Sequence, residues 1–153
     1  MKLLVTGGAG FIGANYVQQV LATHPGDEIV TLDLLTYAGN LANLESVLEN
    51  PRHRFVRGDI ADANVVASAI GDGVDAIVNF AAESHVDRSI ADAGAFLATN
   101  VAGTQVLLDA ARKHGVRRLR CLFNGHVYGR IRDLQDRGRE ARGWRARARG
   151  STE

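Results

Sequence analysis

Three glycines near the start of the chain have the spacing of a phosphate-binding turn. Gly7, Gly10 and Gly13 follow the apolar run Lys2–Thr6, which predicts a buried strand, and they precede residues with helical periodicity. Glycine lets the backbone approach a pyrophosphate closely, and the start of the helix offers unbonded N–H groups and the positive end of its dipole. The first interval is one residue longer than in the common pattern G-x-G-x-x-G. A glycine-rich turn without a ligand is the alternative interpretation.

An acidic residue after the second predicted strand supports the interpretation of the glycine turn as a phosphate-binding turn. The run Glu28–Asp33 is rich in β-branched residues and ends in a carboxylate, about 20 residues beyond the glycines, where a dinucleotide-binding fold places an acid on the ribose. Asp33 can accept hydrogen bonds from both ribose hydroxyls, and its charge would repel a 2′-phosphate. The sequence therefore favours NAD over NADP. An acidic residue at the end of a strand, without a ligand, is the alternative.

The elements that have to position these residues alternate along the chain. Strands are predicted at residues 2–6, 28–33, 54–57, 75–80 and 119–123, with a helical pattern between each strand and the next. This alternation predicts an α/β fold: a doubly wound, Rossmann-like parallel sheet in the order 3-2-1-4-5, formed by one domain over residues 1–129. The last helix is predicted over Asp92–His114. Ligands of such sheets bind at the carboxyl ends of the strands. The polar run 83–88 is expected there, although its composition also suits a solvated loop.

The composition is that of an ordinary globular protein. The chain has 153 residues, of which 46% are hydrophobic and 23% charged, and this length suffices for one domain with a core. No apolar run is long enough to span a membrane and no secretory leader is recognisable, so we expect a cytoplasmic protein. Cys121 is the only cysteine and is expected in the core. No metal site is predicted.

The charge is distributed unevenly. Residues 1–116 carry 7 Lys and Arg against 13 Asp and Glu, whereas residues 117–153 carry 11 Arg against 4 acidic residues. Residues 130–153 lack apolar periodicity, which predicts a disordered Arg-rich tail. A nucleic-acid-binding tail is unsupported because no repeated pattern of aromatic residues alternates with the arginines and no nucleic-acid-binding fold module is recognisable, and a solvated natural tail is a second alternative. Our preferred hypothesis is a shifted or wrongly joined reading frame that begins near Arg118–Cys121.

Residues 1–116 resemble the extended short-chain dehydrogenase/reductase family and, within it, the dTDP-glucose 4,6-dehydratases. The resemblance rests on Thr6–Gly13, on Asp33 with Thr36–Asn40, on Gly58–Ile60, on Asn79–Ser89 and on Asn100–Thr104. The run Ala-Ala-Glu-Ser-His-Val-Asp-Arg-Ser at 81–89 is the most specific of these.

The resemblance implies a tightly bound NAD that oxidises sugar carbon 4, after which water is lost across carbons 5 and 6 and the hydride returns to carbon 6. It implies pyrophosphate contacts at Gly7, Gly10, Phe11, Ile12 and Gly13. It implies ribose contacts at Asp33 and Thr36, adenine contacts at Asp59 and Ile60, and contacts to the nicotinamide half at Ala81, Ala82 and Ser84, with a further cofactor contact at Thr99. Ser84 and His85 would face a nucleotide-sugar substrate such as dTDP-glucose. Leu34 replaces a lysine that is common in the family.

The chain departs from the family after the fifth strand. The family has Ser-Thr-Asp-Glu-Val-Tyr-Gly there, and the Thr, Asp and Glu positions are Asn124, Gly125 and His126 in this chain. A Tyr-x-x-x-Lys pair is also missing, because the last lysine is Lys113. We therefore assign no catalytic residue, and expect the N-terminal half of such an enzyme, inactive as written. The resemblance also implies a homodimer, since members of this type commonly pair as dimers, but dimerisation is doubtful for this chain. A related epimerase or dehydratase acting on UDP- or GDP-sugars, or a non-catalytic NAD-binding module, is the alternative.

Overall fold

The computed structural model describes residues 1–84, 93–123 and 126–127. Its strands are β1 (Lys2–Thr6), β2 (Glu28–Asp33), β3 (His53–Arg57), β4 (Ala76–Asn79), β5 (Arg118–Phe123) and β6 (His126–Val127). Its helices are α1 (Phe11–Thr23), η1 (Leu41–Leu44), α2 (Glu45–Leu48), α3 (Ala63–Ile70), α5 (Ala93–Phe96), η2 (Leu97–Gly103) and α6 (Thr104–Lys113). None of the helices among these residues is long and apolar enough to cross a membrane.

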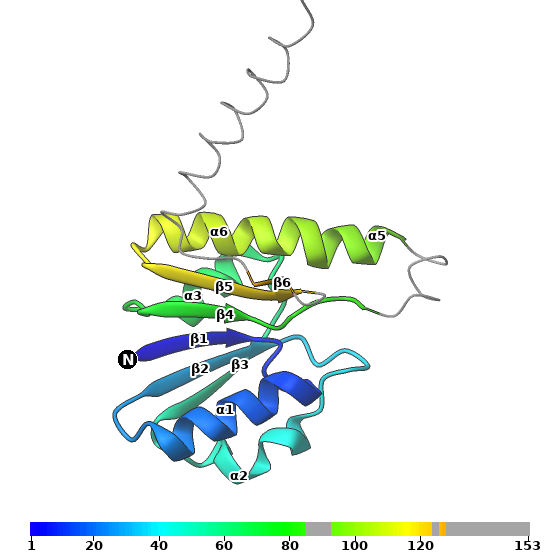
Figure 1. Cartoon of the computed structure of the whole chain (residues 1–153). Helices are drawn as coiled ribbons and strands as arrows, with labels where there is room; N and C mark the ends of the chain where they lie inside the picture. Colours follow the sequence, from blue (N-terminus) through cyan, green and yellow to red (C-terminus); the bar gives the residue numbers. More distant parts are fainter. Residues whose placement is uncertain (85–92, 124–125, 128–153) are drawn as a thin grey trace, which may run out of the picture.

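The strands form one sheet in the order β3-β2-β1-β4-β5-β6. Strands β1 to β5 are mutually parallel, which confirms the predicted order 3-2-1-4-5, and β6 adds an antiparallel strand to β5 that we did not predict. Helix α1 and the short helices η1 and α2 cover one face, and α3 and α6 cover the other (Figure 1). The predicted 130–153 tail lies outside the described residues.

The two faces of the sheet explain why its central strands are almost wholly apolar. Leu4 of β1 packs into the cluster beneath α3 and α6, whereas its neighbours Leu3 and Val5 pack into the cluster beneath α1. Alternate residues of a strand point to opposite faces, so a central parallel strand needs apolar residues at every position. The continuous apolar run in β1 thus reflects a strand that is buried on both faces of the sheet.

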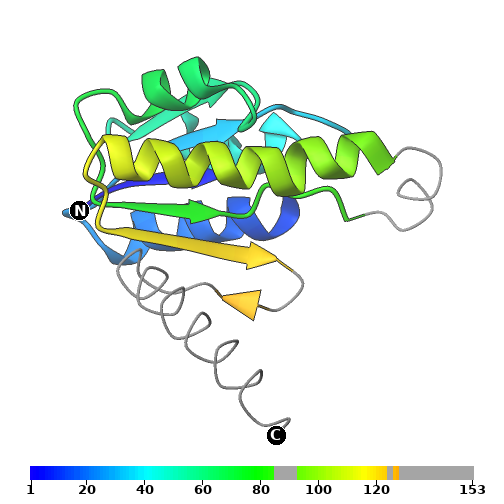
Figure 2. The ribbon, with the colours of Figure 1, turned by 90° about the horizontal axis from the view of Figure 1, so that it is seen from above.

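The helix predicted over 92–114 is not a regular α-helix. It runs as α5, then a π-helical segment η2, then α6, alongside the strands (Figure 2). The π segment changes the helical periodicity over Leu97–Gly103, and with it which side chains face the sheet. Leu97 and Val101 are 61% exposed, and the buried residues of α6 are Leu107, Ala110 and Ala111. A Cβ on Gly103 would come within 2.6 Å of Ile60, so a glycine allows η2 to pack closely there.

Candidate functional site

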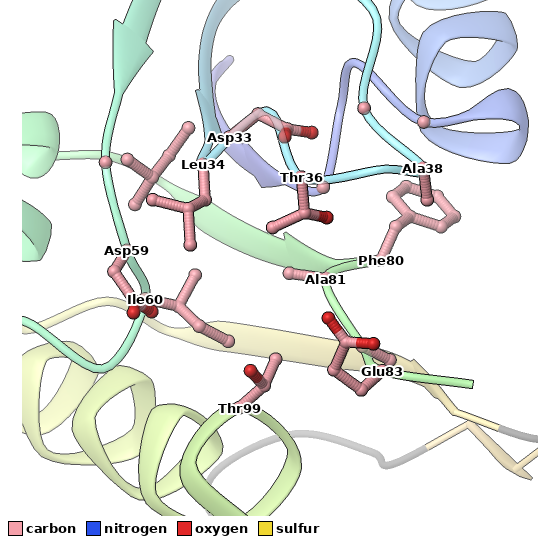
Figure 3. A pocket seen from close by; sticks show the side chains of 16 residues that line it. Asp33, Leu34, Thr36, Ala38, Asp59, Ile60, Phe80, Ala81, Glu83 and Thr99 are labelled. Carbon is pink, nitrogen blue, oxygen red and sulfur yellow. The ribbon is translucent and has the colours of Figure 1, made fainter. Parts of the chain in front are cut away.

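A cavity lies at the carboxyl ends of β1, β2, β3 and β4, where parallel sheets bind ligands. Nine predicted site residues line it: Gly7, Gly10, Asp33, Thr36, Asp59, Ile60, Ala81, Ala82 and Thr99. In Figure 3, Asp33 and Thr36 lie on one side of the cavity, Glu83 and Thr99 on the other, and Ala81 between them. The residues that line the cavity without having been assigned to the site are Leu32, Leu34, Ala38, Gly39, Gly58, Phe80 and Glu83.

The glycine turn packs against the end of β4 on one side and against the first turn of α1 on the other. Gly7 has φ +68°, and a Cβ on it would overlap the backbone nitrogen of Ala81. A Cβ on Gly13 would overlap the carbonyl oxygen of Gly7, so α1 can approach the turn only with glycine at this position. Gly10 is less constrained, since a Cβ there would lie 3.3 Å from the Gly7 oxygen. Two of the three glycines are thus required by packing as well as by any ligand.

Helix α1 begins without a cap. Gly10 occupies the N-cap position and so offers no side chain to cap the first-turn N–H groups, and the first turn holds no acidic residue. These N–H groups and the helix dipole remain available to an anion. The side chains of Phe11 and Ile12 are 83% and 60% exposed and do not line the cavity. The pyrophosphate contact predicted for these two residues could therefore be made only by their backbone N–H groups.

Asp33 is the buried charged group of the cavity wall, with 8% of its surface exposed. Its Oδ2 accepts a hydrogen bond from the N–H of Ala9 at 2.9 Å, and its Oδ1 accepts one from the N–H of Leu35 at 2.8 Å. Leu35 has a positive φ of 58°, a conformation that is costly for leucine and that its own hydrogen bond to Asp33 helps to maintain. Each carboxylate oxygen keeps a second lone pair, so Asp33 can still accept from a ligand hydroxyl.

The third strand contributes a short polar turn to the same cavity. The N–H of Gly58 donates to the carbonyl oxygen of Asp33 at 3.0 Å, which joins the ends of β3 and β2. Asp59 Oδ1 accepts from the N–H of Ala61 at 2.8 Å, and Ile60 is buried with 4% exposed. A flat apolar ligand group could pack against Ile60 while Asp59 offers an acceptor beside it.

A buried hydrogen-bond network, which the sequence reasoning did not assign to the site, fixes the end of β4. Asn79 Oδ1 accepts from the hydroxyl of Thr6 at 2.5 Å and from the N–H of Ala81 at 3.1 Å, while its Nδ2 donates to Cys121 Sγ at 3.7 Å. The Asn79 side chain therefore sets where the Ala81 backbone lies. A polar residue in an otherwise apolar strand is the signal that points to it. Burial raises the pKa of the Cys121 thiol, which lies in the core as predicted.

The segment η2 holds the chain after β4 through a paired contact. The N–H of Glu83 donates to Asn100 Oδ1 at 2.9 Å, and Asn100 Nδ2 donates to the Glu83 carbonyl oxygen at 2.9 Å. A side-chain amide thus satisfies both backbone groups of one residue. Thr99, the neighbour of Asn100, lines the cavity. The positions of Thr99 and of the Ala81–Glu83 run are coupled through this contact.

The other predicted positions are either outside the cavity lining or outside the described residues. Ser84 is exposed and does not line it, and His85 lies outside the described residues. Asn124 and Gly125 also lie outside them. Within the described ranges, no three His, Cys, Asp or Glu side chains are grouped so that they could hold a metal ion.

The comparisons with known proteins agree with the resemblance stated for residues 1–116. The family model described as GDP-mannose 4,6 dehydratase matches residues 4–140. The low-salt glycan biosynthesis protein Agl12 of Haloferax volcanii is 54% identical over 133 residues, covering 87% of this chain and 42% of its own length. The dTDP-glucose 4,6-dehydratase of Streptomyces niveus is 50% identical over 135 residues, covering 86% and 40%.

A solved structure agrees as well. DesIV, a dTDP-glucose 4,6-dehydratase from Streptomyces venezuelae crystallised with NAD and TYD, is 60% identical with a TM-score of 0.73, covering 78% of this chain and 38% of its own. The chain spans about two fifths of the length of these relatives. It belongs to the family that the GDP-mannose 4,6 dehydratase model describes, and its relatives there include dTDP-glucose 4,6-dehydratases.

Proposed function

We propose that this chain binds NAD in the cavity at the strand ends, as the cofactor half-site of a dTDP-glucose 4,6-dehydratase. The observation that carries the proposal is the pairing of two features in one cavity: the carboxylate of Asp33 and the uncapped start of α1. A dinucleotide needs an acceptor for its ribose hydroxyls and N–H groups for its pyrophosphate. The similarity to DesIV, whose crystal structure has NAD bound, supports the choice of cofactor.

The proposed roles of the residues come from the family resemblance, and they are supported by the nine predicted residues that line the cavity. Asp33 and Thr36 would hold the adenosine ribose, with Asp59 and Ile60 at the adenine. The turn from Gly7 to Gly13 would bind the pyrophosphate through its backbone. Ala81, Ala82, Ser84 and Thr99 would contact the nicotinamide half, and Ser84 and His85 a dTDP-sugar. When bound, NAD would supply a hydride acceptor; the chain's own residues bind it, orient it and exclude water from it.

We further propose that the chain as written does not turn over substrate. Asn124, Gly125 and His126 replace the three polar residues that assist the reaction in the family pattern, and no tyrosine is followed by a lysine four residues later. The chain therefore lacks the side chains that the family pattern supplies for moving the protons of the elimination. Purified protein of this sequence, supplied with NAD and dTDP-glucose, is expected to form no 4-keto sugar.

The shifted reading frame remains a prediction. The switch to arginine-rich sequence supports it, whereas the family model still matches as far as residue 140, beyond the expected junction at Arg118–Cys121. Sequencing the coding DNA, together with the mass of the native protein, decides between a shifted and an intact frame.

We also propose a cytoplasmic location, supported by the free thiol of Cys121. Homodimerisation remains doubtful, although Leu97 and Val101 are exposed along the helix that could meet a partner.

The cofactor proposal is tested by comparing NAD with NADP. NAD is expected to raise the melting temperature of the purified chain, and NADP to raise it much less, because Asp33 repels a 2′-phosphate. Asp33→Asn replaces a charged acceptor and should weaken NAD binding about tenfold. Asp72→Asn removes an acid from an exposed turn and serves as the matched control. Equal stabilisation by NAD and NADP, or an Asp33→Asn variant that binds NAD like the wild type, would contradict the assignment.

A further inference from the structure

One hydrogen bond joins two loops that lie on different sides of the cavity. The hydroxyl of Tyr37, in the loop after β2, donates to Glu83 Oε2, in the segment after β4, at 3.1 Å. Thr36 and Ala38, which flank Tyr37, line the cavity, and so does Glu83. Figure 3 shows Thr36 and Ala38 across the cavity from Glu83. The bond therefore links two walls of the cavity, and it connects residues that are 46 positions apart.

Both ends of this bond are anchored to the body of the fold. Asn100 fixes the Glu83 backbone by the two hydrogen bonds of 2.9 Å described above. On the other side, the N–H of Asn40 donates to the carbonyl oxygen of Ala9 at 3.0 Å, which ties the Tyr37 loop to the glycine turn. Two loops fixed in this way need little further ordering to make the bond, so the entropy cost of closing it is small.

The chemistry of the pair suits a contact that opens and closes. A carboxylate is a stronger acceptor than a neutral oxygen, which favours the closed arrangement. Tyr37 is 45% exposed, however, so water can replace either partner and the bond is easily broken. A ligand that reaches from Asp33 to Ala82 would lie along both loops. Its entry and its release would both be affected by whether the loops are joined.

We propose that the Tyr37–Glu83 hydrogen bond is a strap across the cofactor cavity, which opens to admit the dinucleotide and slows its release once closed. This inference rests on the proposed NAD site. Tyr37 and Glu83 are positioning residues here, since they act by joining the two loops. The strap makes the cofactor long-lived in the site without adding a contact to its reactive ring.

The rate of cofactor release measures the strap directly. NADH, followed by its fluorescence, is bound to the full chain and then displaced with excess NAD. Tyr37→Phe removes only the hydroxyl and should speed NADH release by about threefold to tenfold. Glu83→Ala should have the same effect, and the double variant should release NADH no faster than either single variant. Glu83→Gln keeps an acceptor oxygen and should lie between the wild type and Glu83→Ala.

The controls separate the strap from folding and from the site itself. Tyr16→Phe removes the same atom from α1, away from the strap, and should leave the release rate unchanged. The melting temperature of each variant without cofactor shows whether it is folded. No NADH binding by the wild type would overturn both the strap and the NAD site. NADH binding with an unchanged release rate in Tyr37→Phe, or effects that multiply in the double variant, would overturn the strap alone.

Discussion

Gly7 is the residue at which the first turn meets the end of β4. Its φ is +68°, and a Cβ on it would overlap the Ala81 backbone, which cannot move aside because Asn79 holds it. Gly7→Ala should therefore destabilise the fold by about 2–4 kcal/mol, from strained backbone and steric overlap together. Gly26→Ala is the matched control, since nothing lies within 4 Å of a Cβ at that position. Chemical denaturation measures the free energy of unfolding of both variants. Equal losses of stability would contradict the prediction that the close approach at Gly7 requires glycine.

The residues of the cavity wall divide into those that sequence spacing can predict and those that it cannot. Asp33, Asp59 and Ala81 follow strands of a parallel sheet, so their meeting at one edge follows from the strand order. The contact of Asn100 with Glu83 does not follow from the strand order. It joins residues 17 positions apart, and Asn100 lies in the π-helical segment η2, which the sequence did not predict. The Tyr37–Glu83 bond likewise depends on the paths of two loops. Such contacts are set by tertiary packing, which no local pattern encodes.

Among the secondary-structure elements, β3 is joined to β2 and to the end of α2 by His53. Its Nδ1 lies 3.1 Å from the carbonyl oxygen of Val47, so this nitrogen carries the proton, and its Nε2 then accepts from the hydroxyl of Thr31 at 2.9 Å. Burial lowers the pKa of His53 below its ordinary value of 6.5, although the bond to Val47 opposes the shift. The folded state therefore favours the neutral imidazole.

This shift predicts a loss of stability in mild acid. Below about pH 6.5 the unfolded chain takes up a proton on residue 53 that the folded chain resists, so the free energy of unfolding falls with decreasing pH until the lowered pKa is reached, by at most about 1.4 kcal/mol per pH unit. His53→Gln should remove this part of the pH dependence, and His24→Gln, on an exposed residue, should not. Thermal unfolding between about pH 7 and 5.5 measures it. Parallel curves for wild type and His53→Gln would contradict the prediction.

Two elements differ from the sequence prediction, one for a physical reason and one because a signal in the sequence was not used. The helix over 92–114 is predicted by its periodicity, but its π segment η2 is not, because the change of turn goes with close packing of Gly103 on Ile60. Strand β6 could have been predicted: the dipeptide Asn124-Gly125 between β5 and β6 is the strongest short signal for a hairpin.

In the molecule as a whole, the described residues form a sheet whose two faces are unequally covered. Helices α3 and α6 pack on one face, whereas on the other face Val78, Phe80 and Leu122 line an open groove beside α1. The cavity lies at the strand ends, where its walls come from β1 to β4 and from η2. The proposed cofactor site thus uses elements that are all present and packed in this chain.

A calorimetric titration of the purified chain with NAD is the most direct test of the proposed cofactor site. We predict saturable binding with one NAD per chain, because one cavity holds both Asp33 and the uncapped start of α1. The absence of saturable binding at millimolar NAD, from a chain whose circular dichroism shows the helix and strand content described above, would contradict the proposal.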